Sequence, residues 1–473
     1  MAGALRRGRT GDVMTNFWDF SVWGTLNLFA ALLLALLAAN ALKKNIRFLQ
    51  ASLIPTSVLA GLILLLISLV YKPGSEEPLF NSGFFGGNGV AQLEIITYHA
   101  LALGFISSTF RTTHTSFGKQ RTAEIFNTGV TTVSTYLMQG ILGMCITMGA
   151  AATFMKDLLP AAGVLLPFGY GQGTGQALNY GNIYENDWGF YGGRSFGLTI
   201  AAFGFLSASI GGVIFLNVMK KKGRFGPSEE MAEILSSADI QHPDEIPMNG
   251  AMDKMTVQVA FVAAAYLLDY LIMLGLGSLL PGMRSVVYGF NFLFGVIAAI
   301  LIKQIMNLLQ RKAVVKKRYT NNFIMTRISN LCFDIMVVAG IAAIRIEVLK
   351  GYWGILLALG LVGLVSTFLY NRFVAKKLFP EYETEQFLVM YGMLTGTAST
   401  GIMLLREVDG KFETPAADNL VYQNIPAMIF GFPMMLLATL APKQPVLTLG
   451  ILVVFFFFMN VILFRKQLFS KKK

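Results

Sequence analysis

The chain has 473 residues, of which 54% are hydrophobic and only 14% are charged. Its mean hydropathy of +0.59 lies well above that of soluble globular proteins, so the sequence predicts a polytopic membrane protein in a lipid bilayer. A net charge of +12 would indicate nucleic acid as a partner of a soluble protein. Here the basic residues cluster beside apolar runs, as cytoplasmic loops require, and we expect no nucleic-acid partner.

Apolar runs long enough to cross a membrane, which takes about 20 residues, recur along the whole chain. In chain order they cover 19–42, 52–71, 92–110, 128–151, 196–219, 255–280, 285–303, 323–349, 352–371, 420–440 and 446–464. The first run starts late and lacks a small-residue cleavage site, so it predicts a membrane helix and not a signal peptide. Two further stretches, 158–183 and 386–405, are interrupted by Gly, Thr and Ser and predict re-entrant hairpins.

Basic clusters orient these helices, because Lys and Arg accumulate on the cytoplasmic side. All six clusters lie on one side of the membrane if each hairpin enters and leaves the membrane on the same side. The clusters are Lys43, Lys44 and Arg47; Arg111, Lys119 and Arg121; Lys220 to Lys222 with Arg224; Arg311, Lys312, Lys316, Lys317 and Arg318; Arg372, Lys376 and Lys377; and Lys471 to Lys473. We therefore expect a multi-pass protein of the cell (inner) membrane with the N-terminus outside and the C-terminus in the cytoplasm. Only the N-terminal Arg6, Arg7 and Arg9 disagree.

The chain divides into two halves with the same order of elements: four spans, a hairpin and one more span. Thr174-Gly175 and Thr400-Gly401 lie 226 residues apart, and FGF at 203–205 returns at 430–432. Because an odd number of spans separates equivalent points, the halves are predicted to be inverted repeats. The expected parts are a tail (1–18), a first repeat (19–219, hairpin 158–183), a cytoplasmic linker (220–250), a second repeat (251–441, hairpin 386–405), and an extra helix with a basic tail (442–473).

The first hairpin carries glycine at every second position from Gly169 to Gly175. Each glycine disfavours a helix by about 1 kcal/mol relative to alanine, so we expect 169–175 to be non-helical. In hydrocarbon, such backbone survives only inside protein or beside a water-filled cavity. The alternative is that the glycines only let helices pack closely, although such seams use a spacing of four. Half-helices that end inside the membrane expose dipoles suited to ions, which is typical of secondary transporters.

Polar side chains near the two tips are candidate ligands for a small polar solute and a monovalent cation. On the first hairpin they are Gln172, Thr174, Gln176 and Asn179, and on the second Thr395, Thr397, Ser399 and Thr400. Each of them alternatively caps a half-helix. Ionisable residues inside spans indicate function, and Asp269 and Asp334 lie deepest in apolar runs. Asn291 is a further candidate for lining a pathway.

Several motifs resemble the bacterial glutamate:sodium symporter (ESS) family over nearly the whole chain. They are IPTSVLAGLILLLISLVYK (54–72), LALGFISS (101–108), GYGQGTGQAL (169–178) and FGLTIAAFGFLSASIGG (196–212). The resemblance implies sodium-coupled glutamate uptake, a homodimer, and a hairpin-bearing domain that moves against a scaffold. This chain has Gln172 where the family's first tip has histidine, and Gly401 where its second tip has proline.

The sequence thus predicts an all-α membrane protein that co-transports sodium with glutamate or a related small carboxylate. The expected substrate ligands are Gly171, Gln172, Gly173, Thr174, Gly175, Gln176, Thr397, Ser399, Thr400 and Gly401. The expected sodium ligands are Asp334, Asn291, Thr395 and Gly396. A channel and a sodium symporter for another organic anion remain alternatives. An enzyme is not expected, because the three histidines are scattered and form no catalytic constellation.

Overall fold

The computed structural model describes residues 16–72, 78–111, 118–221, 252–312, 319–410 and 413–469. These residues form helices and connecting turns, without a strand. Nearly all of the predicted linker (220–250), most of the N-terminal tail and the basic C-terminal tail lie outside them.

The longer helices follow one another through the whole chain. They are α1 (Phe20–Asn45), α3 (Thr56–Tyr71), α4 (Gly89–Phe110), α5 (Lys119–Thr153), α6 (Leu165–Trp188), α7 (Gly193–Lys221), α9 (Lys254–Leu279), α11 (Asn291–Arg311), α12 (Asn322–Ala342), α13 (Trp353–Leu378), α14 (Glu383–Thr395), α15 (Ala398–Arg406), α17 (Asn424–Leu440) and α18 (Pro445–Leu463). Short helices join them: α2 (Arg47–Ala51), α10 (Arg284–Gly289), α16 (Ala416–Tyr422) and α19 (Arg465–Phe469). Single 3₁₀ turns include η4 (Pro160–Val164) and η6 (Ile346–Leu349).

Length and composition make this an all-α polytopic membrane protein. Among the described residues, 9 helices are long and apolar enough to cross a membrane, or 10 if the bent pair α16 and α17 counts as one span. Helix α3 is apolar but shorter, with 16 residues. This set of helices corresponds to the apolar runs predicted from the sequence.

Three of the predicted spans are interrupted, end early or are bent in the structure. The run 285–303 is not one helix, because α10 and α11 are separated at Phe290. The run 323–349 ends as a helix at Ala342, so Arg345 lies beyond the span. The run 420–440 is bent by 49° between α16 and α17.

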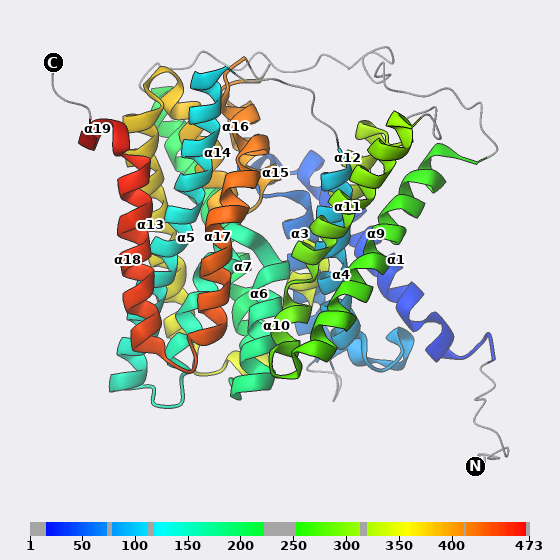
Figure 1. Ribbon diagram of the computed structural model, residues 1–473. Coiled ribbons are helices and arrows are strands. Elements are labelled where there is room, and N and C mark those ends of the chain that lie inside the picture. The colour runs from blue at the N-terminus through cyan, green and yellow to red at the C-terminus, as the bar shows by residue number, and fades with distance from the viewer. Residues whose placement is uncertain are drawn as a thin grey trace.

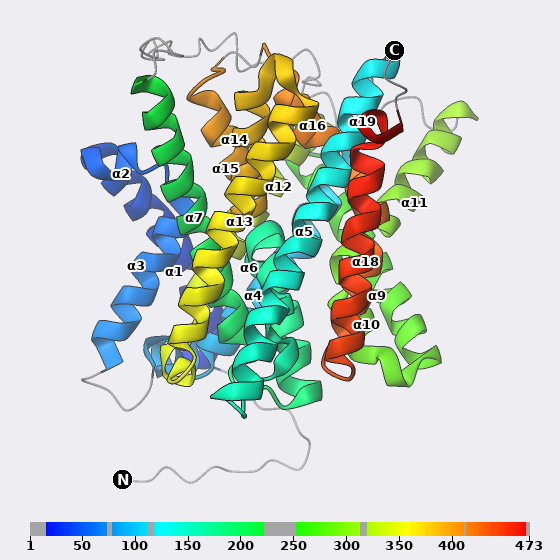
Figure 2. The same ribbon diagram turned by 90° about the vertical axis from the view of Figure 1, so that its left-hand side faces the viewer.

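The helices form two groups with α6 and α7 between them (Figures 1 and 2). The α4 group consists of α1, α3, α4, α9, α11 and α12, and the α5 group of α5, α13, α14, α15, α16, α17 and α18. The described basic clusters lie at the upper ends of α1, α5, α11 and α13 in Figure 1, which we call the upper face. The turn between α6 and α7 lies at the opposite, lower face.

Candidate functional site: two helix breaks

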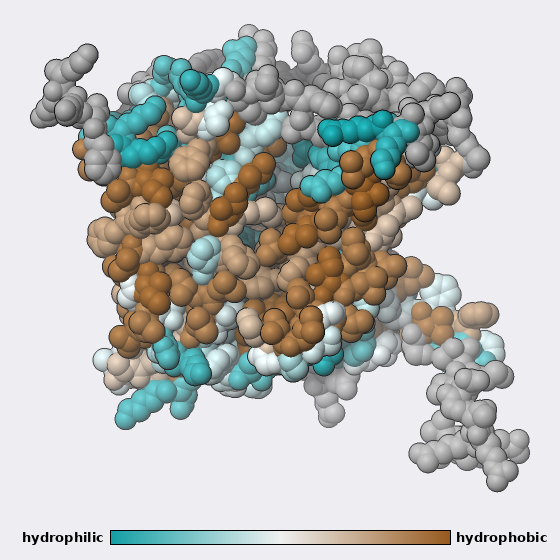
Figure 3. Space-filling view, viewed as in Figure 1, coloured by the Kyte–Doolittle hydropathy of each residue, from teal (hydrophilic) through white to brown (hydrophobic). Residues whose placement is uncertain are grey.

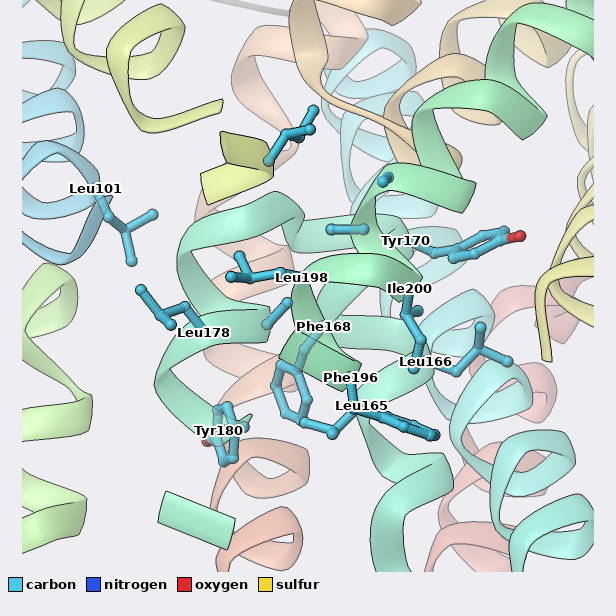
Figure 4. Close-up of a cluster of buried hydrophobic side chains, with 14 of the residues drawn as sticks. Leu101, Leu165, Leu166, Phe168, Tyr170, Leu178, Tyr180, Phe196, Leu198 and Ile200 are labelled. Atoms are coloured by element: carbon cyan, nitrogen blue, oxygen red, sulfur yellow. The ribbon is translucent and has the colours of Figure 1, made fainter. Parts of the chain in front are cut away.

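Helix α6 is broken at one residue, Gly173, whose φ of 77° and ψ of −169° are open almost only to glycine. The chain reverses direction there. Phe168 and Tyr180, which would lie about 18 Å apart along a straight helix, instead stack with ring centroids 3.8 Å apart (Figure 4). The residues 165–172 and 174–188 therefore form two arms that lie side by side in the lower half of the molecule.

The expectation that all of 169–175 is non-helical was wrong in its extent, because only Gly173 departs from helical geometry. A spacing of two on a helix turns successive glycines toward different neighbours. A methyl group on Gly169 would lie 2.7 Å from Ile200, and one on Gly175 would lie 2.8 Å from Leu101. Gly171 leaves no room beside the ring of Tyr136. Close packing therefore explains these three glycines, as the alternative interpretation held, and Gly173 makes the turn.

The second break separates α14 from α15 at Gly396 and Thr397. Gly396 has a φ of −146° and a ψ of −107°, and the extended Thr397 caps α15 by accepting a hydrogen bond from the amide of Thr400 at 3.4 Å. The two arms pack with almost no space between them, since a methyl group on Gly392 would lie 2.7 Å from the Cα of Gly401. This hairpin lies in the upper half of the molecule (Figure 1).

The two breaks meet in the middle of the molecule. A methyl group on Gly173 would lie 3.9 Å from the Cγ2 of Thr397. Gly204 of α7 lies beside both breaks, because a methyl group there would lie 2.6 Å from the carbonyl oxygen of Thr395 and 3.2 Å from the Cα of Tyr170. Two segments that are more than 200 residues apart in sequence thus form one site.

Helix α5 holds both breaks through two side chains one turn apart. The hydroxyl of Tyr136 donates to the carbonyl of Gly171 at 3.0 Å, and the amide of Gln139 donates to the carbonyl of Leu394 at 3.0 Å. These carbonyls end the first arm of each hairpin and have lost their helical partners. Sequence reasoning missed both side chains, although polar residues inside a spanning run were a signal for them.

Most of the predicted hydroxyl ligands are bonded to protein in this conformation. Thr174 donates to the carbonyl of Met336 on α12 at 3.2 Å, and Thr395 donates to the carbonyl of Tyr391 at 2.6 Å. The hydroxyls of Thr397 and Thr400 lie 3.3 Å apart. The predicted capping role therefore accounts for part of this set.

Gln176 differs from these residues, because it is only 1% exposed and neither atom of its amide group has a partner. It shares a helix face with Gly173 and Tyr180, three residues before it and four after it, so it faces the first arm. A buried amide without partners costs about 1–3 kcal/mol. This amide is the best-placed unoccupied donor and acceptor at the first break.

The second break opens toward the upper face. Ser399 is exposed and Thr397 is half-buried, whereas Gly173 and Thr174 are buried. The space-filling view shows a hollow between the two groups in the upper half of the molecule, with polar residues in its depth (Figure 3). Ala398 and Ser399, at the start of α15, are exposed. Their N–H groups have no acceptor within the helix and carry positive partial charge.

The predicted sodium ligands do not gather in one place. Thr395 and Gly396 belong to the second break, whereas Asp334 is exposed on α12 and hydrogen bonds with Ser57 at the start of α3. Asn291 contacts α4, where its amide donates to the carbonyl of Tyr98 at 3.2 Å.

No protein-family model, curated protein or solved structure matches the chain. The resemblance to the glutamate:sodium symporter family therefore depends on the sequence motifs alone.

Proposed function

We propose that this protein is a sodium-coupled symporter that takes up glutamate or a related small carboxylate by alternating access. The observation that carries the proposal is the meeting of the two breaks at Gly173 and Thr397. Broken helices from two halves of a chain that meet inside a membrane bundle are characteristic of secondary transporters.

The helix contacts support two inverted repeats, 19–219 and 251–441. Helix α1 packs on α3 as α9 packs on α11, and α3 contacts α12 as α11 contacts α4. Helices α4 and α12 contact each other, as do α5 and α13, which a twofold axis requires of its nearest elements. Helix α1 runs from the lower to the upper face and α9 runs the opposite way (Figure 1). The hairpins then are re-entrant loops that enter from opposite sides.

The charge distribution supports a cytoplasmic upper face, with the N-terminus outside and the C-terminus inside. The second break, with its exposed Ser399, would then be accessible from the cytoplasm, so this conformation would face inward. In the alternate conformation of an inverted-repeat transporter, the first break would become accessible from outside as the second is now.

Ion pairs near the lower face join α6 and α7 to the α4 group. Arg194 of α7 contacts Glu94 of α4 at 2.9 Å, and Arg345 beyond α12 contacts Glu185 of α6 at 3.3 Å. Glu185 also accepts a hydrogen bond from the Arg194 amide at 3.0 Å. We call these four side chains the lower latch, and opening to the outside would have to break it.

The chemistry of the second break supports an anionic substrate. The exposed N-terminus of α15 offers N–H groups and a positive dipole, and no described acidic side chain is part of that break. Such termini bind carboxylates. Sodium coupling is carried by the family resemblance and by the neutral oxygens of Thr395 and Gly396, and a homodimer by the resemblance alone.

Uptake into proteoliposomes tests the proposal. Labelled glutamate should accumulate when a sodium gradient points inward, and replacing external sodium by choline should abolish the accumulation. Accumulation that is unchanged in choline would refute the coupling, and a flux that never exceeds equilibrium would favour a channel. Competition by a panel of amino acids and dicarboxylates would identify the substrate.

Thr397→Val tests the site itself. It keeps the size of the side chain but removes the cap of α15, at a cost of about 1 kcal/mol, next to the first break. We expect uptake to fall several-fold while the protein stays folded. Thr326→Val is the matched control, because the Thr326 hydroxyl donates only to the carbonyl of Asn322 on its own helix, at 2.8 Å. Equal uptake by the two variants would remove Thr397 from the site.

A further inference from the structure

A buried carboxylate without any partner lies away from the two helix breaks. Asp269 of α9 is 0% exposed, and neither of its carboxylate oxygens has a hydrogen-bond partner. Asn291 of α11 is also 0% exposed, and its Oδ1 atom has no partner either. A buried carboxylate costs free energy unless it is paired with a positive charge or hydrogen-bonded, so the unpaired oxygens of Asp269 need an explanation.

The two side chains belong to α9 and α11, which pack on each other. A methyl group on Gly295 would lie 3.8 Å from the Oδ2 atom of Asp269, so the carboxylate lies against Gly295. Asn291 precedes Gly295 by four residues and therefore lies on the same face of α11. Because the Nδ2 atom of Asn291 donates to the carbonyl of Tyr98, the free Oδ1 atom of its amide is left as an acceptor.

The described groups beside Asn291 offer oxygen atoms. The hydroxyls of Tyr98 and Tyr266 lie beside the Asn291 amide. The Tyr98 hydroxyl donates its proton to the carbonyl of Tyr288 at 2.7 Å, and the Tyr266 hydroxyl is paired with Nδ1 of His99. Among the described residues, no lysine or arginine forms an ion pair with Asp269. Because the Tyr98 hydroxyl donates its proton to Tyr288, its oxygen keeps lone pairs that can accept a further contact.

We propose that Asp269 and Asn291 form a binding site for a sodium ion, with the hydroxyl oxygen of Tyr98 as a further ligand. All three orphaned atoms are oxygen acceptors, so a hard monovalent cation would satisfy every one of them at once. A single carboxylate neutralises one positive charge, which disfavours Ca²⁺ and Mg²⁺, ions that take more acidic or more hydrated sites. The site lies within the α4 group, between α4, α9 and α11, and is separate from Thr395 and Gly396.

Sodium binding to the purified protein in nanodiscs tests the site without transport. We expect Asp269→Asn to bind one ²²Na⁺ fewer per chain than the wild type at saturation. Asn291→Leu keeps the carboxylate and should weaken this site roughly tenfold, as the loss of one good polar contact does. Asp157→Asn, which changes an exposed carboxylate near the lower face, is the matched control and should bind sodium as the wild type does.

Thermal unfolding gives a second measurement. With choline in place of sodium, Asp269→Asn should unfold at a higher temperature than the wild type, because it removes an unpaired buried charge. Added sodium should then narrow or reverse this difference. Unchanged sodium binding in Asp269→Asn would overturn the proposal, as would wild-type stability that does not respond to sodium, because Asp269 then carries a proton.

These outcomes are distinguishable from failure of the proposed function. If uptake does not depend on sodium but Asp269→Asn still binds one ion fewer, the symport proposal fails and the site stands. If uptake requires sodium but binding is the same in Asp269→Asn and Asp157→Asn, the symport proposal stands and the site fails.

Discussion

Breaking the lower latch should shift the protein toward a conformation that is open to the outside. The perturbation is Glu94→Gln, which keeps the shape of the side chain but removes its charge. The variant leaves Arg194 without the charge of its partner on α4, while the contacts of Arg194 with Asn182 at 2.9 Å and Asn186 at 3.1 Å remain. The change therefore weakens the tie between α7 and α4 without removing a helix contact.

The free energy lost in Glu94→Gln follows from the burial of the Arg194 and Glu94 side chains. The Arg194 and Glu94 side chains are 25% and 12% exposed, so water screens their 2.9 Å contact only in part. A charge-assisted hydrogen bond contributes about 1.5–3 kcal/mol, and a neutral replacement keeps roughly half of that. A loss of about 0.8–1.5 kcal/mol corresponds to roughly a four- to twelvefold larger population of the outward-open state.

The assay measures thiol labelling from each side of the membrane. Gln172→Cys in a background with Cys145→Ala and Cys332→Ala reports on the first break. If the inward-facing state dominates, Glu94→Gln should raise the labelling rate from outside by roughly four- to twelvefold and should hardly change the labelling rate from inside.

Lys72→Gln is the matched control. It breaks the ion pair of Lys72 and Glu347, which lies at the same face but joins the ends of α3 and α12 within one group. We expect it to leave the labelling rate unchanged. If Glu94→Gln and Lys72→Gln label alike, the lower latch does not control opening and the reasoning fails.

Two further variants test the breaks. Gly204→Ala would place a methyl group 2.6 Å from the carbonyl of Thr395, and it should abolish uptake and lower the stability by about 1–3 kcal/mol. Gly450→Ala is the control and should change neither, because its methyl group would meet nothing within 4 Å. Normal uptake by Gly204→Ala would contradict the geometry. Gln176→Met removes an unpaired buried amide and should raise unfolding stability by about 1–3 kcal/mol while uptake falls; unchanged uptake would leave Gln176 without a role.

The glycine run shows how far sequence reasoning reached at the site. Composition located the break within a few residues, because few other residue types tolerate the backbone of Gly173. It did not distinguish this glycine from Gly169, Gly171 and Gly175. Those three positions require glycine because α7, α5 and α4 pack closely against them. Tertiary contacts of this kind are absent from a propensity scale.

The break between α10 and α11 was not predictable for a related reason. Phe290 is neither glycine nor proline, and its φ of −95° and ψ of 20° lie near the helical region. The helix ends there because distant side chains satisfy two of its carbonyls: Tyr98 donates to Tyr288 at 2.7 Å and Asn179 donates to Gly289 at 3.2 Å. Local sequence does not contain those donors.

Asn291 is the first residue of α11, directly after the same break. It is buried between helices of the α4 group, so it lies apart from the predicted sodium ligands Thr395 and Gly396. An uninterrupted helix over 285–303 gave no reason to place Asn291 beside Asp269. Starting α11 at Asn291 turns its side chain toward α4 and α9. Apolar pattern and charge thus predicted the helices and their order, whereas the grouping of polar side chains depended on where single helices end.

The hold of α5 on both hairpins has a consequence for specificity. Tyr136 and Gln139 are three residues apart, so the positions at which they hold the two hairpins differ by about 4.5 Å along helix α5. Helix α5 therefore sets the distance between the two hairpin tips, and substitutions at the tips do not change that distance. Variation at Gln172 or Ser399 would change which chemical groups are read, and a substrate of a different length would require changes on α5.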